Sequence, residues 1–161
     1  MSYYDEISRG YEELHREEQE KKIALIKQHL KVNPEEKLLD VGCGTGLTTR
    51  PWKCKRFGID PSKKLLEKAK KSDPEGEYVL APAEKIPFPD KSFDIVISIT
   101  AIQNFNNIEK GLNEIKRVGK GKFILSFLKK SGKREKIESA ISSLFKPASK
   151  IEEDKDIIFL I

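Results

Sequence analysis

The sequence predicts a single α/β domain, built on one doubly wound, mostly parallel sheet with helices on both faces. The chain has 161 residues, the length of one domain, and 37% of them are hydrophobic. Apolar segments of strand length alternate with segments whose apolar residues recur at helical spacing. Alternating strands and helices favour parallel pairing through right-handed crossovers, so these segments are expected to form one layered sheet.

The first half of the chain is expected to hold two helices and three strands. A charged helix over about 11–30 ends before Pro34, and a second helix begins at Pro61. The expected strands are Lys37–Val41, Phe57–Ile59 and Tyr78–Leu80. Pro51 interrupts the segment between the first two strands, so the crossover helix there is expected to be little more than one turn.

The second half continues the alternation up to the last residue. Phe93–Ile99 contains one charged residue, as expected for a strand that is covered on both faces. Helices are expected from about Ile108 to Gly119 and around residues 137–144. The remaining strands are Phe123–Phe127 and Ile157–Ile161, of which the last is expected to be antiparallel. Residues 1–161 are interpreted as one domain, in which 1–33 form a helical lid or cap.

A glycine-rich turn follows the first buried strand. The sequence Leu38–Gly46 carries glycines at 42, 44 and 46, and the next strand ends in an acid, Asp60. Glycines at a strand end let the backbone bend tightly and approach a ligand without a Cβ in the way. A carboxylate at the neighbouring strand end can accept hydrogen bonds from a ribose diol, and ligands of open parallel sheets bind at this edge. Dinucleotide sites use a different spacing, with a third glycine where Leu47 stands.

Three linked segments resemble the class I S-adenosylmethionine (SAM)-dependent methyltransferases. Leu38–Gly46 resembles their motif I, and Gly58–Ser62 resembles the segment that follows it. Ala83–Asp94 is similar to their next signature, a loop that wraps the adenine and leads into the fourth strand. Tyr4–Ile7 together with Tyr11 resembles the N-terminal lead-in of the type 11 branch. The resemblance covers essentially the whole chain and is specific for SAM as cofactor, with S-adenosylhomocysteine (SAH) as product, but not for the acceptor.

The resemblance implies roles for individual residues around the cofactor. The glycine turn would line the methionine part of SAM through backbone groups, and Asp40 would help to position the amino group. Asp60 would hold both ribose hydroxyls. The implied cofactor-binding residues are Tyr11, Asp40, Gly42, Cys43, Gly44, Asp60, Pro61, Ala83, Glu84, Ser98 and Ile99. Pro82 stands where the family often has an acid that accepts from the adenine amino group, so that contact is lost or is taken over by Glu84.

The residues after the fourth strand are expected to face the methyl group. Methyl transfer needs in-line approach in a desolvated pocket more than it needs acid–base groups. Gln103, Asn104 and Tyr11 are weak catalytic candidates. Gln103 and Asn104 have an alternative role as caps of the helix that begins near Asn107, and Tyr11 has an alternative role in packing.

The distribution of charge leaves two interpretations of the second half. Residues 110–136 carry ten Lys and Arg side chains against two Glu. Such a region suits RNA, with Lys116, Arg117, Lys129, Lys130, Lys133 and Arg134 expected to flank the pocket mouth. The alternative is a solvated lysine-rich surface, common in heat-adapted proteins, which the scarcity of Cys and Met also fits.

The expected function is therefore methyl transfer from SAM to an undetermined acceptor, with a small molecule preferred. The alternatives are an RNA methyltransferase acting on tRNA or rRNA, and a SAM-binding module that needs a partner subunit for catalysis. The apolar runs are of strand length, the N-terminus does not look like a signal peptide, and the two cysteines have no metal-ligand spacing. We therefore expect a cytoplasmic protein with no membrane span and no metal.

Overall fold

The structure is a computed structural model that describes residues 3–147 and 149–161. The chain divides into two compact units, one that ends at Lys31 and one from Val32 to Ile161. The first unit contains the helix α1 (Tyr3–Lys27), which begins earlier than the sequence pattern indicated. That residues 1–33 serve as a lid stays a prediction. None of the helices among the described residues is long and apolar enough to cross a membrane.

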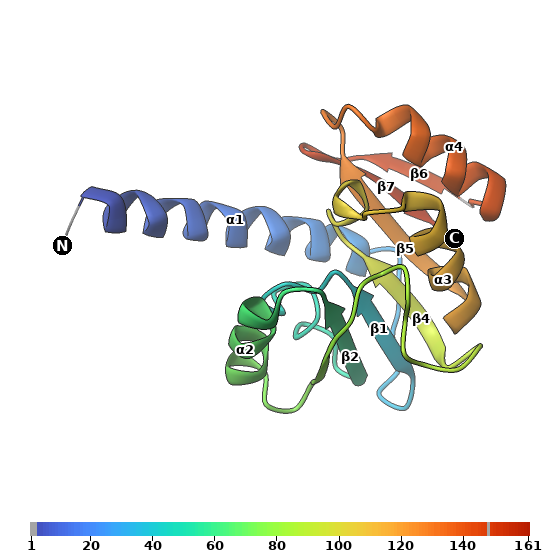
Figure 1. The fold of residues 1–161 in the computed structure, drawn as a ribbon, viewed down its shortest axis with the longest axis horizontal. Helices are drawn as coiled ribbons and strands as arrows, with labels where there is room; N and C mark the ends of the chain where they lie inside the picture. The colour runs from blue at the N-terminus through green and yellow to red at the C-terminus, as the bar shows by residue number, and fades with distance from the viewer. Residues whose placement is uncertain (1–2, 148) are drawn as a thin grey trace. The chain divides into compact units, whose positions relative to one another are not determined.

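The second unit is a seven-stranded sheet with the strand order β3-β2-β1-β4-β5-β7-β6 (Figure 1). The strands are β1 (Lys37–Val41), β2 (Lys55–Asp60), β3 (Glu77–Leu80), β4 (Phe93–Ser98), β5 (Gly119–Leu128), β6 (Ser149–Glu152) and β7 (Asp156–Leu160). The first five pair in parallel, and β7 runs antiparallel to both β5 and β6. The doubly wound sheet and the antiparallel last strand are confirmed.

The helices of this unit cover opposite faces of the sheet. They are α2 (Lys63–Ser72), α3 (Ile108–Val118), α4 (Arg134–Leu144) and the short 3₁₀ helix η1 (Ile102–Asn104). Leu66 and Ala69 of α2 pack in one cluster with Tyr78, whereas Val79 packs against the main core that contains α3 and α4. Successive residues of a strand point to opposite faces, so α2 lies on the face opposite α3 and α4.

Two segments differ from the sequence pattern, and a third agrees with it. The strand β6 was missed, because its sequence Ser-Lys-Ile-Glu is largely exposed at the sheet edge and carries no apolar signal. The helix α2 begins at Lys63 rather than at Pro61, since Ser62 is its N-cap and its Oγ accepts a hydrogen bond from Leu65 N. Between β1 and β2 there is only one helical turn, closed by Arg50 N donating to Gly46 O, as predicted.

Candidate functional site

The glycine turn after β1 adopts a backbone that side chains disfavour. Gly42, Gly44 and Gly46 have φ angles of 77°, 54° and 87°, in the left-handed region. The N–H groups of Gly42 and Cys43 both donate to Ile59 O at 2.9 Å, which ties the turn to the end of β2. A Cβ at Gly44 would meet no atom within 4 Å, so the backbone there borders open space.

Asp60 lies at the end of β2, next to this turn. Its Oδ2 accepts a hydrogen bond from Gly44 N at 2.9 Å, and its Oδ1 accepts one from Ser62 N at 2.9 Å. A carboxylate has about four acceptor positions, so each oxygen retains the capacity to accept from a ligand. Asp60 is 8% exposed, and that exposed part borders a cavity.

A cavity of about 320 Å³ lies at the carboxyl ends of the parallel strands. Its lining includes most of the residues that the sequence placed at the cofactor: Gly42, Gly44, Asp60, Pro61, Ala83 and Glu84. One weak catalytic candidate, Asn104, also lines it. The structure adds Leu65 and Pro82. The lining also contains Thr100, Ala101, Phe105 and Asn106, from the segment after the fourth strand that was expected to face the methyl group. This size and mixed lining suit a small organic ligand.

Asp40 lies beneath the glycine turn and is fully buried. Its Oδ2 accepts hydrogen bonds from the hydroxyls of Thr48 at 2.6 Å and Thr49 at 2.7 Å. Its Oδ1 is buried and accepts no hydrogen bond from the part of the chain that the structure describes. Burial raises the pKa of Asp40 from 3.8 to about 7; the two threonine hydroxyls oppose this rise and the charge of Asp60 adds to it.

Three other predicted residues are buried rather than part of the cavity lining. The side chain of Cys43 packs with Tyr78 and Leu66, and burial raises the pKa of its thiol, which does not suit a nucleophile. Ser98 Oγ donates to Val41 O at 2.8 Å and joins β4 to β1. Ile99 is 3% exposed. Tyr11 is part of α1, but its side chain is outside the described residues.

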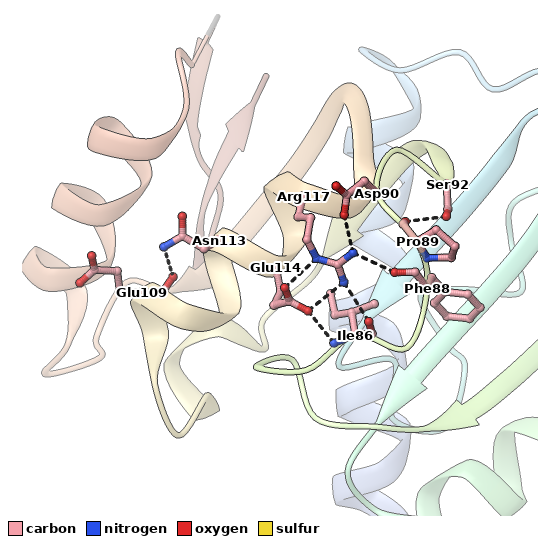
Figure 2. A network of polar contacts seen from close by, with 9 residues as sticks. All are labelled: Ile86, Phe88, Pro89, Asp90, Ser92, Glu109, Asn113, Glu114 and Arg117. Carbon is pink, nitrogen blue, oxygen red and sulfur yellow. Dashed lines mark hydrogen bonds and ion pairs between the residues drawn. The ribbon is translucent and has the colours of Figure 1, made fainter.

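The loop between β3 and β4 is held by one arginine, Arg117 of α3. Figure 2 shows its guanidinium donating to Ile86 O and Phe88 O, each at 2.9 Å, and pairing with Glu114 and Asp90, each at 2.8 Å. Glu114 Oε2 also accepts from Ile86 N. The Arg117 guanidinium holds the pKa of Glu114 below its usual range. These contacts fix the loop whose beginning, residues 82–84, lines the cavity.

The expectation that Lys116 and Arg117 flank the pocket mouth was wrong. The helix α3 begins after the carboxyl end of β4 and runs back, so its last turn lies where β5 begins, at the amino ends of the strands. Arg117 O accepts from Lys91 N, just before β4, which confirms this position. Lys129, Lys130, Lys133 and Arg134 follow the carboxyl end of β5, and Arg134 pairs with Glu138 and Glu152.

The capping role considered for Gln103 and Asn104 was also wrong. Asn107 is the N-cap of α3, since its Oδ1 accepts from Lys110 N at 3.0 Å. Both predicted caps belong instead to η1, where Gln103 Nε2 donates to Thr100 O at 2.8 Å. Glu84 Oε2 accepts from Asn107 N, which links the cavity lining to the start of α3. Among the described residues no group of three His, Cys, Asp or Glu side chains is placed to hold a metal.

Comparison with known proteins identifies the family. Residues 39–126 match the model of a methyltransferase domain, type 11. The chain is 34% identical over 147 residues to demethylmenaquinone methyltransferase of Thermotoga maritima, a match that covers 83% of this chain and 64% of that protein. For two further curated relatives the covered share of their length is 49% and 40%, so the chain spans only part of these proteins.

Solved structures share the fold. A SAM-dependent methyltransferase from Aquifex aeolicus superimposes with a TM-score of 0.74 at 18% identity, over 86% of this chain and 87% of that one. A complex between the Haloferax volcanii Trm112 methyltransferase activator and a methyltransferase gives 0.76 at 16% identity, over 98% and 93%. Since the domain match covers more than half of the 161 residues, the chain belongs to the class I, type 11 family of SAM-dependent methyltransferases.

Proposed function

We propose that the protein transfers the methyl group of SAM to a small-molecule acceptor in the cytoplasm. The observation that carries this proposal is the pair formed by Gly44 N and the Asp60 carboxylate at the cavity wall, 2.9 Å apart. At this point the backbone of Gly44, which borders open space, lies beside the Asp60 carboxylate, whose oxygens can still accept hydrogen bonds from a ligand. A ligand that joins a ribose diol to an amino-acid group matches these two features.

The charge of the groups around the cavity also suits SAM. SAM supplies an electrophilic methyl group on a sulfonium that carries positive charge. Asp60 would accept from the ribose hydroxyls, and the backbone at Gly42 and Gly44 would contact the methionine part. Asp40, whose pKa is raised to about 7, would add negative charge beneath the turn when it ionises, and its buried Oδ1 lacks a donor among the described residues. Cationic ligands favour ionised carboxylates nearby, so both acids support this assignment.

The adenine would lie between Pro61 and the loop that starts at Pro82. Leu65, Ala83 and the two prolines supply apolar lining, and Glu84 supplies a carboxylate. One oxygen of Glu84 already accepts from Asn107 N. Its other oxygen would accept from the adenine amino group in place of the acid that Pro82 replaces. Ser98 and Ile99 would support the floor from β4 without lining the cavity.

A small-molecule acceptor is supported by the far wall of the cavity. This wall is formed by residues of the segment after β4: Thr100, Ala101, Phe105 and the amides of Asn104 and Asn106. Phe105 is only 8% exposed. The residues of this wall that line the cavity offer apolar, hydroxyl and amide groups and include no Lys or Arg. Next to this wall, Lys133 Nζ donates to Gln103 O in η1 at 3.0 Å. The relative from Thermotoga maritima is a demethylmenaquinone methyltransferase, whose name states a small-molecule substrate.

The test is methyl transfer from labelled SAM by the purified chain, followed by mass spectrometry of the products. Fractionated small molecules and bulk tRNA are offered separately as acceptors. Label in a small molecule, with a rate nearly independent of salt, supports the proposal. Label in tRNA, with binding that persists at physiological salt and is lost on charge reversal of Lys129, Lys130 and Lys133, assigns an RNA acceptor instead. SAM binding without transfer until another subunit is added overturns the proposal for this chain alone.

A further inference from the structure

Thr100, which follows β4 and lines the cavity, has an unusual backbone. Its φ angle is 55°, in the left-handed region. A β-branched residue rarely adopts this conformation, because its side chain crowds the backbone. Such outliers persist only where surrounding contacts hold them, and they gather at functional sites.

Two hydrogen bonds hold Thr100 to the neighbouring strands. Its Oγ1 donates to Asp156 Oδ2 at 2.6 Å, and its N–H donates to Ser126 Oγ at 2.9 Å. Ser126 Oγ in turn donates to the same Asp156 Oδ2 at 2.8 Å. Asp156 and Ser126 are completely buried. Both tethers therefore converge on one carboxylate oxygen, and the Thr100 hydroxyl approaches it at the distance of a charge-assisted hydrogen bond.

The antiparallel direction of β7 brings this carboxylate to the cavity. Asp156 is the first residue of β7 and pairs with Leu128, at the carboxyl end of β5. The two strands lie side by side in Figure 1. Because β7 runs opposite to the parallel strands, its beginning meets their carboxyl edge, where the cavity lies.

The conformation of Thr100 sets the adjacent wall. Thr100 O accepts from Gln103 Nε2, which anchors η1 and with it Asn104. The next residue, Ala101, lies against the glycine turn, since a Cβ built on Gly42 would come within 2.6 Å of Ala101 Cβ. A change of the backbone conformation at Thr100 would therefore displace η1 with Asn104, and also Ala101, which lies against the glycine turn.

We propose that Asp156 is a positioning residue that holds Thr100 in its left-handed conformation, directly and through Ser126, and thereby sets the wall of the ligand pocket. The inference rests on the proposed function for the ligand used to test it. Asp156 is not among the residues that line the cavity, so its effect on the pocket is expected to pass through Thr100.

The experiment measures SAH binding by calorimetry on the full chain, well below the melting temperature of every variant. Asp156→Asn and Thr100→Val should each weaken SAH binding about tenfold, because each removes the charge-assisted hydrogen bond. Thr100→Ser keeps the hydroxyl and should stay within about twofold. The double variant Thr100→Val/Asp156→Asn should bind no worse than Asp156→Asn, because both changes break one network.

Glycine at position 100 separates positioning from general stability. It takes the left-handed conformation without a tether, so Asp156→Asn added to Thr100→Gly should change SAH affinity less than about twofold. Asp94→Asn is the matched control, since Asp94 bonds Lys37 N at the opposite edge of the sheet. A lower melting temperature for Asp156→Asn with unchanged SAH affinity overturns the inference. Absence of SAM and SAH binding in the unmodified chain overturns the proposed function instead.

Discussion

On the side of β1 and β2, the pocket is built from backbone groups and carboxylates that lie close together in the sequence. Gly44 and Asp60 are 16 positions apart and contact each other directly. On the side of β4, the wall at Thr100 is held by Asp156, 56 positions later in the chain. The first wall, at Gly44 and Asp60, is held by contacts between residues close in sequence and suits a cofactor. The second wall, at Thr100, depends on how the C-terminal strands pair. The two walls are therefore expected to respond differently to substitution.

The largest effect is expected on the first wall, from the titration of Asp40. Its pKa is raised from 3.8 to about 7, so the folded protein keeps a proton that the unfolded chain releases above pH 4. The free energy of unfolding should therefore fall as the pH rises from about 4 to about 7, by up to about 4 kcal/mol. Asp40→Asn cannot ionise and should lack this decline. Urea denaturation of both proteins across this range tests it, and a pH-independent difference between them would contradict the raised pKa.

A side chain at Gly42 should disturb both walls at once. The φ angle there is 77°, and a Cβ would lie 2.6 Å from Ala101 Cβ. Gly42→Val should lower the free energy of unfolding by about 3 kcal/mol, combining backbone strain with overpacking. Gly132→Ala is the control, because a Cβ there meets nothing within 4 Å. If chemical denaturation shows that Gly42→Val lowers the free energy of unfolding by less than about 1 kcal/mol, the glycine turn and Ala101 can move apart without a large energetic cost, which contradicts this prediction.

Removing the guanidinium of Arg117 should loosen the loop that leads from the first wall to the start of β4. Arg117→Gln loses its donors to Ile86 O and Phe88 O and its ion pairs with Glu114 and Asp90. We expect a loss of about 2 kcal/mol in the free energy of unfolding. Lys116→Gln, on the exposed neighbouring position, should change it by less than about 0.5 kcal/mol. Equal losses of stability from the two substitutions would contradict the role assigned to Arg117 in holding this loop.

The smallest effect is expected at the start of α3, behind the second wall. Asn107→Ala removes the side-chain cap that accepts from Lys110 N and should cost about 1 kcal/mol of stability. Asn107→Asp should retain it. Thermal melting of these variants beside Asn104→Ala checks the position of the cap. A larger loss at Asn104 would restore the capping role that the structure assigns to Asn107.

The contrast between the walls also explains what the sequence could predict. The motif from Asp40 to Gly46, with Asp60 at the next strand end, places its residues by local geometry. The structure accordingly brings Gly42, Gly44, Asp60, Pro61, Ala83 and Glu84 to one cavity.

The segment after the fourth strand was expected at the pocket, but the contact between Thr100 and Asp156 was missed, because it arises from strand order and from the direction of β7. The signal in the sequence was an acid, Asp156, directly before the apolar segment 157–161. The sequence did not indicate that Asp156 would contact Thr100. The error over Lys116 and Arg117 had a similar origin. Both ends of a helix were assigned to one sheet edge, although α3 returns the chain to the opposite edge.

The most direct test of the central claim is calorimetry with SAH on the unmodified chain, Asp60→Ala and Asp94→Asn. The unmodified chain should bind in the micromolar range, about −8 kcal/mol. Asp60→Ala should remain folded and weaken binding by about 1.5–3 kcal/mol, the range for hydrogen bonds to a charged group. Asp94→Asn should leave it unchanged. An unaltered affinity in Asp60→Ala, or binding of a nicotinamide dinucleotide with no heat from SAM or SAH, would contradict the assignment of this cavity as the cofactor site.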